Sequence, residues 1–213
     1  MISHKHTHSH RMAKVTDIKL CVSGAAETGH CGIDAYEKAK ELGREIVRQG
    51  GTLLTGATTG FPQWAAMGAK EMEGFSIGVS PARTEEEHVH IYRLPVDYMD
   101  IMLYTGLGYS GRDIVLTNSG DAVFFGCGRI GTVHEFTVAF ENEKPIGILE
   151  GDWATDEVLK MVIDKGNRAN AKIVFDKDPK KLIEKVMALV LQDKKNLFKS
   201  YKNAQPVPNA IHY

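Results

Sequence analysis

The stretch that decides the fold is residues 121–135, which read DAVFFGCGRIGTVHE. After Asp121, residues 122–125 form a short apolar run with one β-branched and two aromatic side chains, ended by glycine, so residues 121–125 are predicted as a buried strand. The glycine turn 126–131 follows directly, and apolar residues at helical spacing continue over residues 132–142. A strand, a glycine turn and a helix in immediate succession are typical of one unit of a parallel sheet.

The rest of the chain repeats this alternation. Further strands are predicted at residues 18–23, 52–55, 75–80, 145–149 and 172–175, and further helices at 34–49, 63–73, 111–118, 155–165 and 179–192. Strands separated by helix-length segments form right-handed crossovers and a parallel sheet covered on both faces. We therefore predict a single doubly wound, Rossmann-like α/β domain whose sheet is mostly parallel. Ligands of such sheets bind at the carboxyl ends of the strands, where the strand order reverses.

The chain of 213 residues has the length of one domain with two tails. Residues 1–14 read as a flexible leader in which alternate histidines would bind Ni²⁺ or Zn²⁺ loosely. Residues 15–193 form the predicted nucleotide-binding domain, and residues 194–213 form a polar C-terminal extension. The long segment 81–108 is predicted as a linker, and its apolar side chains suit a partner surface or a lid.

The composition excludes several classes of function. A formal net charge of −1 argues against nucleic-acid binding through bulk electrostatics. The longest apolar run, residues 186–191, is far shorter than the ~20 residues of a membrane-spanning helix, and no signal peptide is recognisable. The three cysteines are an odd number without a C-x-x-C pair, which favours a reducing, cytoplasmic compartment.

Three predicted strands end in glycine-containing turns, at residues 23–26, 56–60 and 126–132. Glycine lets the backbone approach a ligand, and the helix behind each turn offers free N–H groups to an anion. Three such turns at one sheet edge predict a phosphate-bearing ligand. The candidate binding residues are Gly24, Ala25, Gly56, Thr58, Thr59, Gly128, Arg129, Gly131 and Thr132.

Standard phosphate motifs do not fit. The chain has no G-x-x-x-x-G-K-[ST], and the strict G-x-G-x-x-G fingerprint is missing after the first strand and matches only at residues 126–131. No acidic residue lies at the end of a nearby second strand, where it would bind the 2′-hydroxyl of a ribose. We therefore predict neither NAD nor another cofactor.

Residues 128–135 resemble the Pro-Gly-Gly-x-Gly-Thr-x-x-Glu signature of the Lonely Guy proteins, which are cytokinin-riboside-monophosphate phosphoribohydrolases. The matching residues are Gly128, Gly131, Thr132 and Glu135, whereas Cys127 replaces the proline and Arg129 replaces a glycine. Upstream, Arg112 is all that remains of the family's Met-His-Glu-Arg-Lys string. Residues 50–57 and 65–69 also resemble the family, in its Gly-Gly strand and the small-residue helix that follows. The resemblance therefore spans roughly residues 17–150, and the departures from the signature indicate a divergent branch of the family.

The resemblance implies a homodimer or higher homo-oligomer that hydrolyses the N-glycosidic bond of a nucleoside 5′-monophosphate. Glu135 would be the catalytic carboxylate, which stabilises an oxocarbenium-like state and activates water, and Arg112 would hold the phosphate or orient Glu135. Residues 132–135 also fit a capping box, which would need no catalysis. The alternative function is a nucleotide sensor, or a carrier of a phosphorylated cofactor such as molybdenum cofactor. The resemblance does not support lysine decarboxylase activity, since no lysine here is marked as cofactor-bearing.

Four cysteine and histidine side chains fall in loops that we expect to meet at the switch in strand order: His30, Cys31, Cys127 and His134. Both residue types are common zinc ligands. Their spacing matches no standard zinc motif, so the sequence predicts no metal site.

Overall fold

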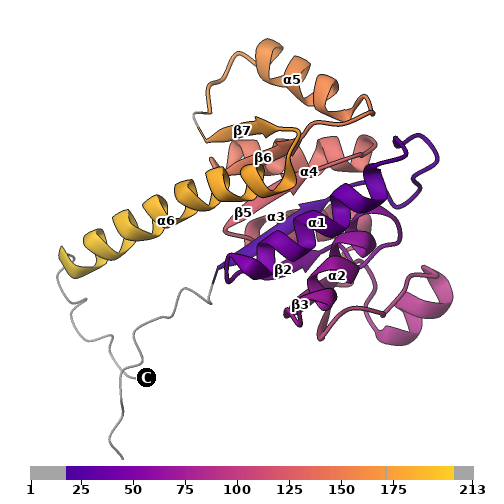
Figure 1. The fold of residues 1–213 in the computed structure, drawn as a ribbon. Helices are drawn as coiled ribbons and strands as arrows, with labels where there is room; N and C mark the ends of the chain where they lie inside the picture. Colours follow the sequence, from indigo (N-terminus) through magenta and orange to yellow (C-terminus); the bar gives the residue numbers. More distant parts are fainter. Residues whose placement is uncertain (1–17, 171, 204–213) are drawn as a thin grey trace, which may run out of the picture.

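The computed structural model describes residues 18–170 and 172–203. Seven parallel strands form one sheet in the order β4-β3-β2-β1-β5-β6-β7 (Figure 1). The strands are β1 (Lys19–Ser23), β2 (Thr52–Thr55), β3 (Ser76–Ser80), β4 (Ile101–Tyr104), β5 (Ala122–Phe125), β6 (Ile146–Leu149) and β7 (Ile173–Asp176). The prediction of a doubly wound α/β domain is confirmed.

Helices cover both faces of this sheet. They are α1 (Ala35–Arg48), α2 (Phe61–Glu71), α3 (Gly108–Ser119), α4 (Ile130–Glu141), α5 (Thr155–Lys165) and α6 (Pro179–Asn203), with a short π-helix, η2 (Glu87–Ile91). Helices α1, α2 and α6 contribute to one buried cluster, and α3, α4 and α5 contribute to the other.

The period of two along each strand divides its side chains between these clusters. In β1, Leu20 and Val22 join the α1 face, while Cys21 joins the α4 face. Because both faces are covered, β5 is apolar and buried along its whole length, and such an uninterrupted apolar run is typical of a parallel strand.

The segment predicted as a linker at residues 81–108 contains an additional strand. Strand β4 pairs with β3 at the edge of the sheet, with Ile77 opposite Ile101. Its side chains are exposed or half-buried, as those at the edge of a sheet can be. Of the segment's predicted apolar surface, Tyr98 is exposed and Met99 packs against the core.

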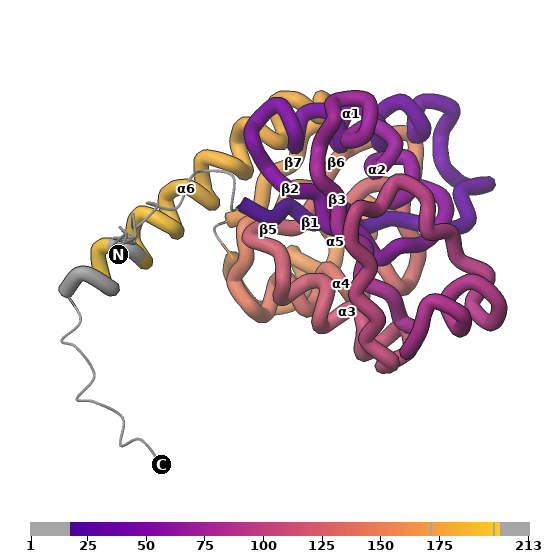
Figure 2. Tube along the Cα trace, turned by 90° about the horizontal axis from the view of Figure 1, so that it is seen from below, coloured from indigo at the N-terminus to yellow at the C-terminus, as the bar shows by residue number. Residues whose placement is uncertain are grey.

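Helix α6 is longer than the predicted helix at residues 179–192. It continues to Asn203, and its later turns extend away from the body of the domain (Figure 2). The leader at residues 1–14 and the chain after residue 203 lie outside the described residues, so the tail boundaries stay predictions. No described helix has the length and apolar character needed to cross a membrane.

Candidate ligand pocket

The strand order reverses between β1 and β5, since chain order runs outward from this pair in both directions. At their carboxyl ends lies a cavity of about 710 Å³. Its walls come from the loops after β1, β2 and β5 and from the beginnings of α3 and α4. The lining residues are 24–27, Thr58, Tyr109, Arg112, Asp113, 129–132 and Glu135.

Most of the predicted site residues meet in this cavity. Its lining includes Gly24, Ala25, Thr58, Arg112, Arg129, Gly131, Thr132 and Glu135. The other three predicted binding residues, Gly56, Thr59 and Gly128, are not among the residues that line it.

Those three residues contact the protein itself. A side chain at Gly56 would collide with the Arg112 guanidinium, so this glycine makes room for the arginine. The Thr59 hydroxyl donates to the Ala26 carbonyl at 3.1 Å. The Gly128 N–H donates to Thr155 Oγ1 at 2.7 Å. A direct ligand contact for them stays a prediction.

The floor of the pocket holds a buried carboxyl group. Glu135, on α4, accepts a hydrogen bond through Oε2 from the hydroxyl of Ser23, at the end of β1. Its other oxygen, Oε1, lies 4.0 Å from Nη1 of Arg112, which comes from α3. Three elements therefore hold one carboxyl group, and all three side chains are buried.

Burial raises the pKa of Glu135 from its ordinary value of 4.5 to about 7, because a buried carboxylate loses its hydration. The Arg112 cation opposes this shift, and the neighbouring Asp113 carboxylate adds to it. Near neutral pH the group is therefore poised between its acid and base forms.

Arg112 brings a buried positive charge to the pocket wall. Its Nε lies 3.3 Å from Oδ1 of Asp113, yet it has no hydrogen-bond partner among the residues that the structure describes, although it is buried. The guanidinium also lies 5.9 Å from the centre of the Tyr109 ring. A buried guanidinium beside a cavity favours an anionic ligand, because its N–H donors suit phosphate and carboxylate oxygens.

The amino end of α4 offers a second anion site. The helix begins at Ile130, and the amides of its first turn have no partner within the helix. Gly131 and Thr132, in this turn, line the pocket. A Cβ at Gly131 would meet no atom within 4 Å, so the backbone there is open to a ligand.

The capping-box interpretation of residues 132–135 is wrong. The N-cap position is Arg129, and no side chain caps the helix. Thr132 is the third helical residue, and Glu135 lies in the second turn, where its carboxyl group accepts from Ser23. A capping role for Glu135 is therefore excluded, and its catalytic role stays a prediction.

Sequence reasoning missed several residues of the site. Ser23 is the last residue of a central strand beside β5, and that position at the switch in strand order is the signal that could have found it. Asp113 lies beside Arg112 and contacts His134 Nδ1 through Oδ2 at 2.9 Å. At the rim, Arg129 pairs with Glu27 across the mouth of the pocket.

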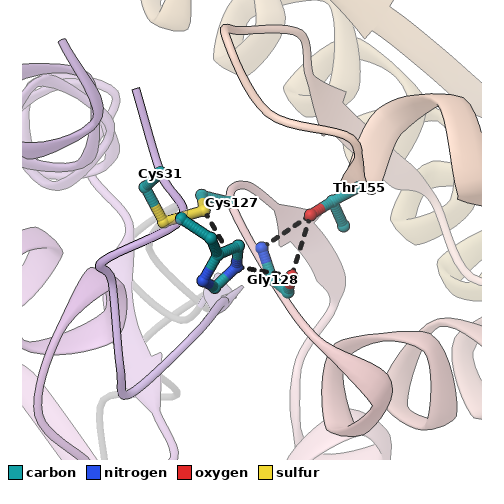
Figure 3. The surroundings of a disulfide bond; sticks show 5 residues. Cys31, Cys127, Gly128 and Thr155 are labelled. Carbon is teal, nitrogen blue, oxygen red and sulfur yellow. Dashed lines mark hydrogen bonds between the residues drawn. A yellow bond between two sulfur atoms is a disulfide. The ribbon is translucent and has the colours of Figure 1, made fainter. Parts of the chain in front are cut away.

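A disulfide joins Cys31, in the loop after β1, to Cys127, in the loop after β5 (Figure 3). The cysteine count did not predict this pairing, because the two residues are 96 positions apart and only the fold brings them together. His30 lies beside them, with Nε2 3.5 Å from the Cys127 sulfur. Of the four groups expected to converge, His134 alone lies elsewhere, against Asp113.

The all-parallel sheet, the reversal between β1 and β5 and the pocket at that point define a Rossmann-like ligand-binding protein. The chain belongs to the SLOG cluster4 family, whose profile matches residues 17–183. This family is related to the Lonely Guy proteins, so the resemblance is confirmed at the level of family.

Individual relatives include proteins with stated ligands. The molybdenum cofactor binding protein of Rippkaea orientalis is 28% identical, with a TM-score of 0.63 over 81% of this chain and 96% of that one. The molybdenum cofactor carrier protein of Chlamydomonas reinhardtii is 28% identical, with a TM-score of 0.64 over 82% and 99%. An uncharacterized protein of Archaeoglobus fulgidus is 27% identical over 62% of this chain and 82% of its own length.

Proposed function

We propose that the pocket binds a nucleoside monophosphate or a similar phosphorylated ligand and that the protein hydrolyses its N-glycosidic bond. The observation that carries this proposal is the buried pair at the pocket floor, with Arg112 Nη1 4.0 Å from Glu135 Oε1. A guanidinium suits the phosphate, and a carboxyl group with a pKa of about 7 suits proton transfer near neutral pH.

The phosphate would lie between the start of α4 and Arg112. The free amides of Gly131 and Thr132 and the positive end of the helix dipole favour an anion there. Arg112 adds a charged donor that burial keeps from bulk water. The protonated form of Glu135 is uncharged, so it would not repel the phosphate as the ligand binds.

The chemical step uses the ionised form of Glu135. Its carboxylate accepts a proton from water as the water oxygen bonds to C1′ of the ribose, and the base departs with the glycosidic electron pair. The departing base then takes up one proton, equivalent to the one that Glu135 accepted, so Glu135 returns to its carboxylate form. The same negative charge stabilises the oxocarbenium-like transition state. Ser23 is a positioning residue, because its hydroxyl fixes one oxygen of Glu135.

A second candidate is a carrier of a phosphorylated cofactor such as molybdenum cofactor. Two relatives that are 28% identical are described as proteins that bind or carry it. Cys127 and Arg129 also depart from the hydrolase signature at the turn that would face the ligand. In a carrier, the pocket would hold its ligand without turnover.

One experiment separates these functions. AMP, GMP, CMP and UMP are each incubated with the protein, binding is measured by calorimetry, and free base is measured by chromatography. Release of base from any of them supports hydrolysis. Binding without base release contradicts the enzyme and leaves the carrier, which is then tested with molybdenum cofactor itself. If neither the nucleotides nor the cofactor binds, both proposals fail.

We also propose a homodimer, as the resemblance implies. The edge strand β4 exposes Ile101 and Leu103, at 44% and 47%, beside the exposed Tyr98. Apolar side chains along an unpaired sheet edge favour association with another chain. Light scattering at micromolar concentration should give a mass twice that of one chain. The Ile101→Lys variant should give a lower mass than the wild type. A monomeric wild type contradicts the dimer.

A further inference from the structure

The cluster of Cys31, Cys127 and His30 has no part in the proposed function. It lies at the same sheet edge as the pocket, with Cys127 in the glycine turn 126–131 and the other two residues in the loop after β1. Cys127 is buried, Cys31 is half-buried and His30 is exposed, so the cluster opens to solvent on the histidine side.

The three side chains already have the spacing of a metal site. Their ligand atoms lie within 4.8 Å of one another. His30 points Nε2 at both the Cys127 sulfur, 3.5 Å away, and the Gly128 carbonyl oxygen, 3.1 Å away. A neutral imidazole and two thiolates are the donor set that zinc prefers, and thiolates select against Mg²⁺ and Ca²⁺.

The backbone would need little movement to exchange a disulfide for a metal. The Cα atoms are 5.8 Å apart. Two thiolates on one tetrahedral zinc, each at about 2.3 Å, have their sulfur atoms about 3.8 Å apart. Rotation about the side-chain bonds supplies this increase in sulfur spacing. The loops themselves are joined independently, because the Ala25 N–H donates to the Cys127 carbonyl at 2.7 Å.

We propose that Cys31, Cys127 and His30 form a Zn²⁺ site when a dithiol has reduced the disulfide. The same two cysteines are then either joined by the disulfide or bound to the metal. Reduction converts the protein disulfide and the dithiol into two protein thiols and the oxidised reductant. Binding of Zn²⁺ then releases two protons as both thiols become thiolates. The three protein ligands leave the fourth position for water, on the exposed side of the cluster.

Both states tie the loop after β1 to the loop after β5, and both loops line the ligand pocket. The disulfide does so covalently, and the metal does so through bonds that a chelator can remove. The site stands independently of the proposed activity, because its ligands neither line the pocket nor contact Glu135.

The test uses the full chain, treated with a dithiol and then freed of it without air. Thiols counted in denaturant should number three after reduction, against one, Cys21, in the oxidised protein. Co²⁺ is then titrated as a probe. The reduced protein should bind one equivalent with a thiolate-to-cobalt charge-transfer band, and Zn²⁺ should displace it. The oxidised protein should show no such band.

The histidine-rich leader also binds metals loosely, so the matched control is the Cys31→Ser/Cys127→Ser double variant, which keeps that leader. It should lose the charge-transfer band completely. His30→Gln should retain the band and bind about 10- to 100-fold more weakly.

Two outcomes overturn the proposal. If the native protein keeps its disulfide under conditions that reduce an exposed one, the bond is a fixed cross-link. If the reduced protein binds no more Co²⁺ than the double variant does, the thiols are no metal site.

Discussion

Two clusters of reactive side chains lie beside the loop that follows β5, and they differ in how they are held. The pocket cluster of Arg112, Asp113 and Glu135 is charged, buried and assembled without covalent bonds. The sulfur cluster of Cys31 and Cys127 is uncharged and covalently linked. Burying a charged side chain costs free energy unless its partners are held in place. The charged cluster therefore depends on rigid loops around the pocket. The covalent bond supplies part of that rigidity from the other side of the loop.

Breaking the sulfur cluster has the largest expected effect on stability. The disulfide closes a loop of 96 residues, and the loss of that constraint on the unfolded chain costs about 4 kcal/mol. Urea unfolding of the oxidised protein should therefore have a higher midpoint than unfolding with a dithiol present and a chelator excluding metal. The Cys31→Ser/Cys127→Ser variant should not respond to the dithiol. Equal midpoints for the oxidised and reduced wild type would contradict this role.

Glu135→Gln addresses the charged cluster through activity. The amide keeps the size of the side chain and can still accept from Ser23, but it carries no negative charge. Base release should fall by about 100-fold or more, while ligand affinity stays within about tenfold. Glu141→Gln is the matched control, since Glu141 lies at the exposed end of the same helix and pairs with Arg168. Unchanged base release by Glu135→Gln would exclude it from catalysis.

The pH dependence of stability tests the burial of Glu135 directly. Its pKa is higher in the folded protein than in the unfolded chain, so the folded state binds its proton more tightly. This contribution to the free energy of unfolding is complete below about pH 4.5 and is lost as pH rises through about 7, amounting to about 3 kcal/mol at most.

Other carboxyl groups titrate over the same range, so the informative quantity is the difference between wild type and Glu135→Gln. The stability of the wild type relative to the variant should decrease between pH 4.5 and 7.5 in urea unfolding. A constant difference would show that the carboxyl group is not desolvated.

Arg112→Ala should weaken both binding and turnover, because the partner phosphate is charged already in the ground state. We expect a loss of about 10- to 100-fold in affinity for the nucleotide. Arg112→Lys keeps the charge without the planar fork of donors, so it should recover part of the loss. Affinity that does not change in the alanine variant, measured by calorimetry on folded protein, would remove Arg112 from the ligand site.

Arg129 should have the smallest effect, because it lies at the exposed rim and already pairs with Glu27. Exposed ion pairs contribute under about 1 kcal/mol, so Arg129→Ala should weaken ligand affinity by less than about fivefold. Glu27→Ala frees Arg129 for the phosphate and should change the affinity in the opposite direction. A larger loss in Arg129→Ala would place Arg129 among the principal phosphate contacts.

The sequence by itself determined the layers of this protein and the edge at which its pocket lies. Buried parallel strands must be apolar on both faces and their turns must be tight, so residues 121–135 show strand, turn and helix directly. Strand β4 was not predicted, although Ile101–Tyr104 is an apolar run, because it lies within the long segment 81–108 that was interpreted as a linker. The signature residues Thr132 and Glu135 were likewise visible, since they are close in the chain.

Only the tertiary structure decided which side chains meet. Ser23 and Glu135, or Cys31 and Cys127, are about a hundred residues apart, and local patterns carry no information about contacts at such separations. Their meeting depends on β1 pairing with β5, which brings the two loops together at one edge. The partner of Glu135 was also decided by the tertiary structure, because its carboxyl group accepts from Ser23 instead of capping its own helix, which begins at Ile130. The sequence alone favoured the cap because a Thr and a Glu three residues apart suit one, and nothing nearby in the chain marks Ser23 as the partner.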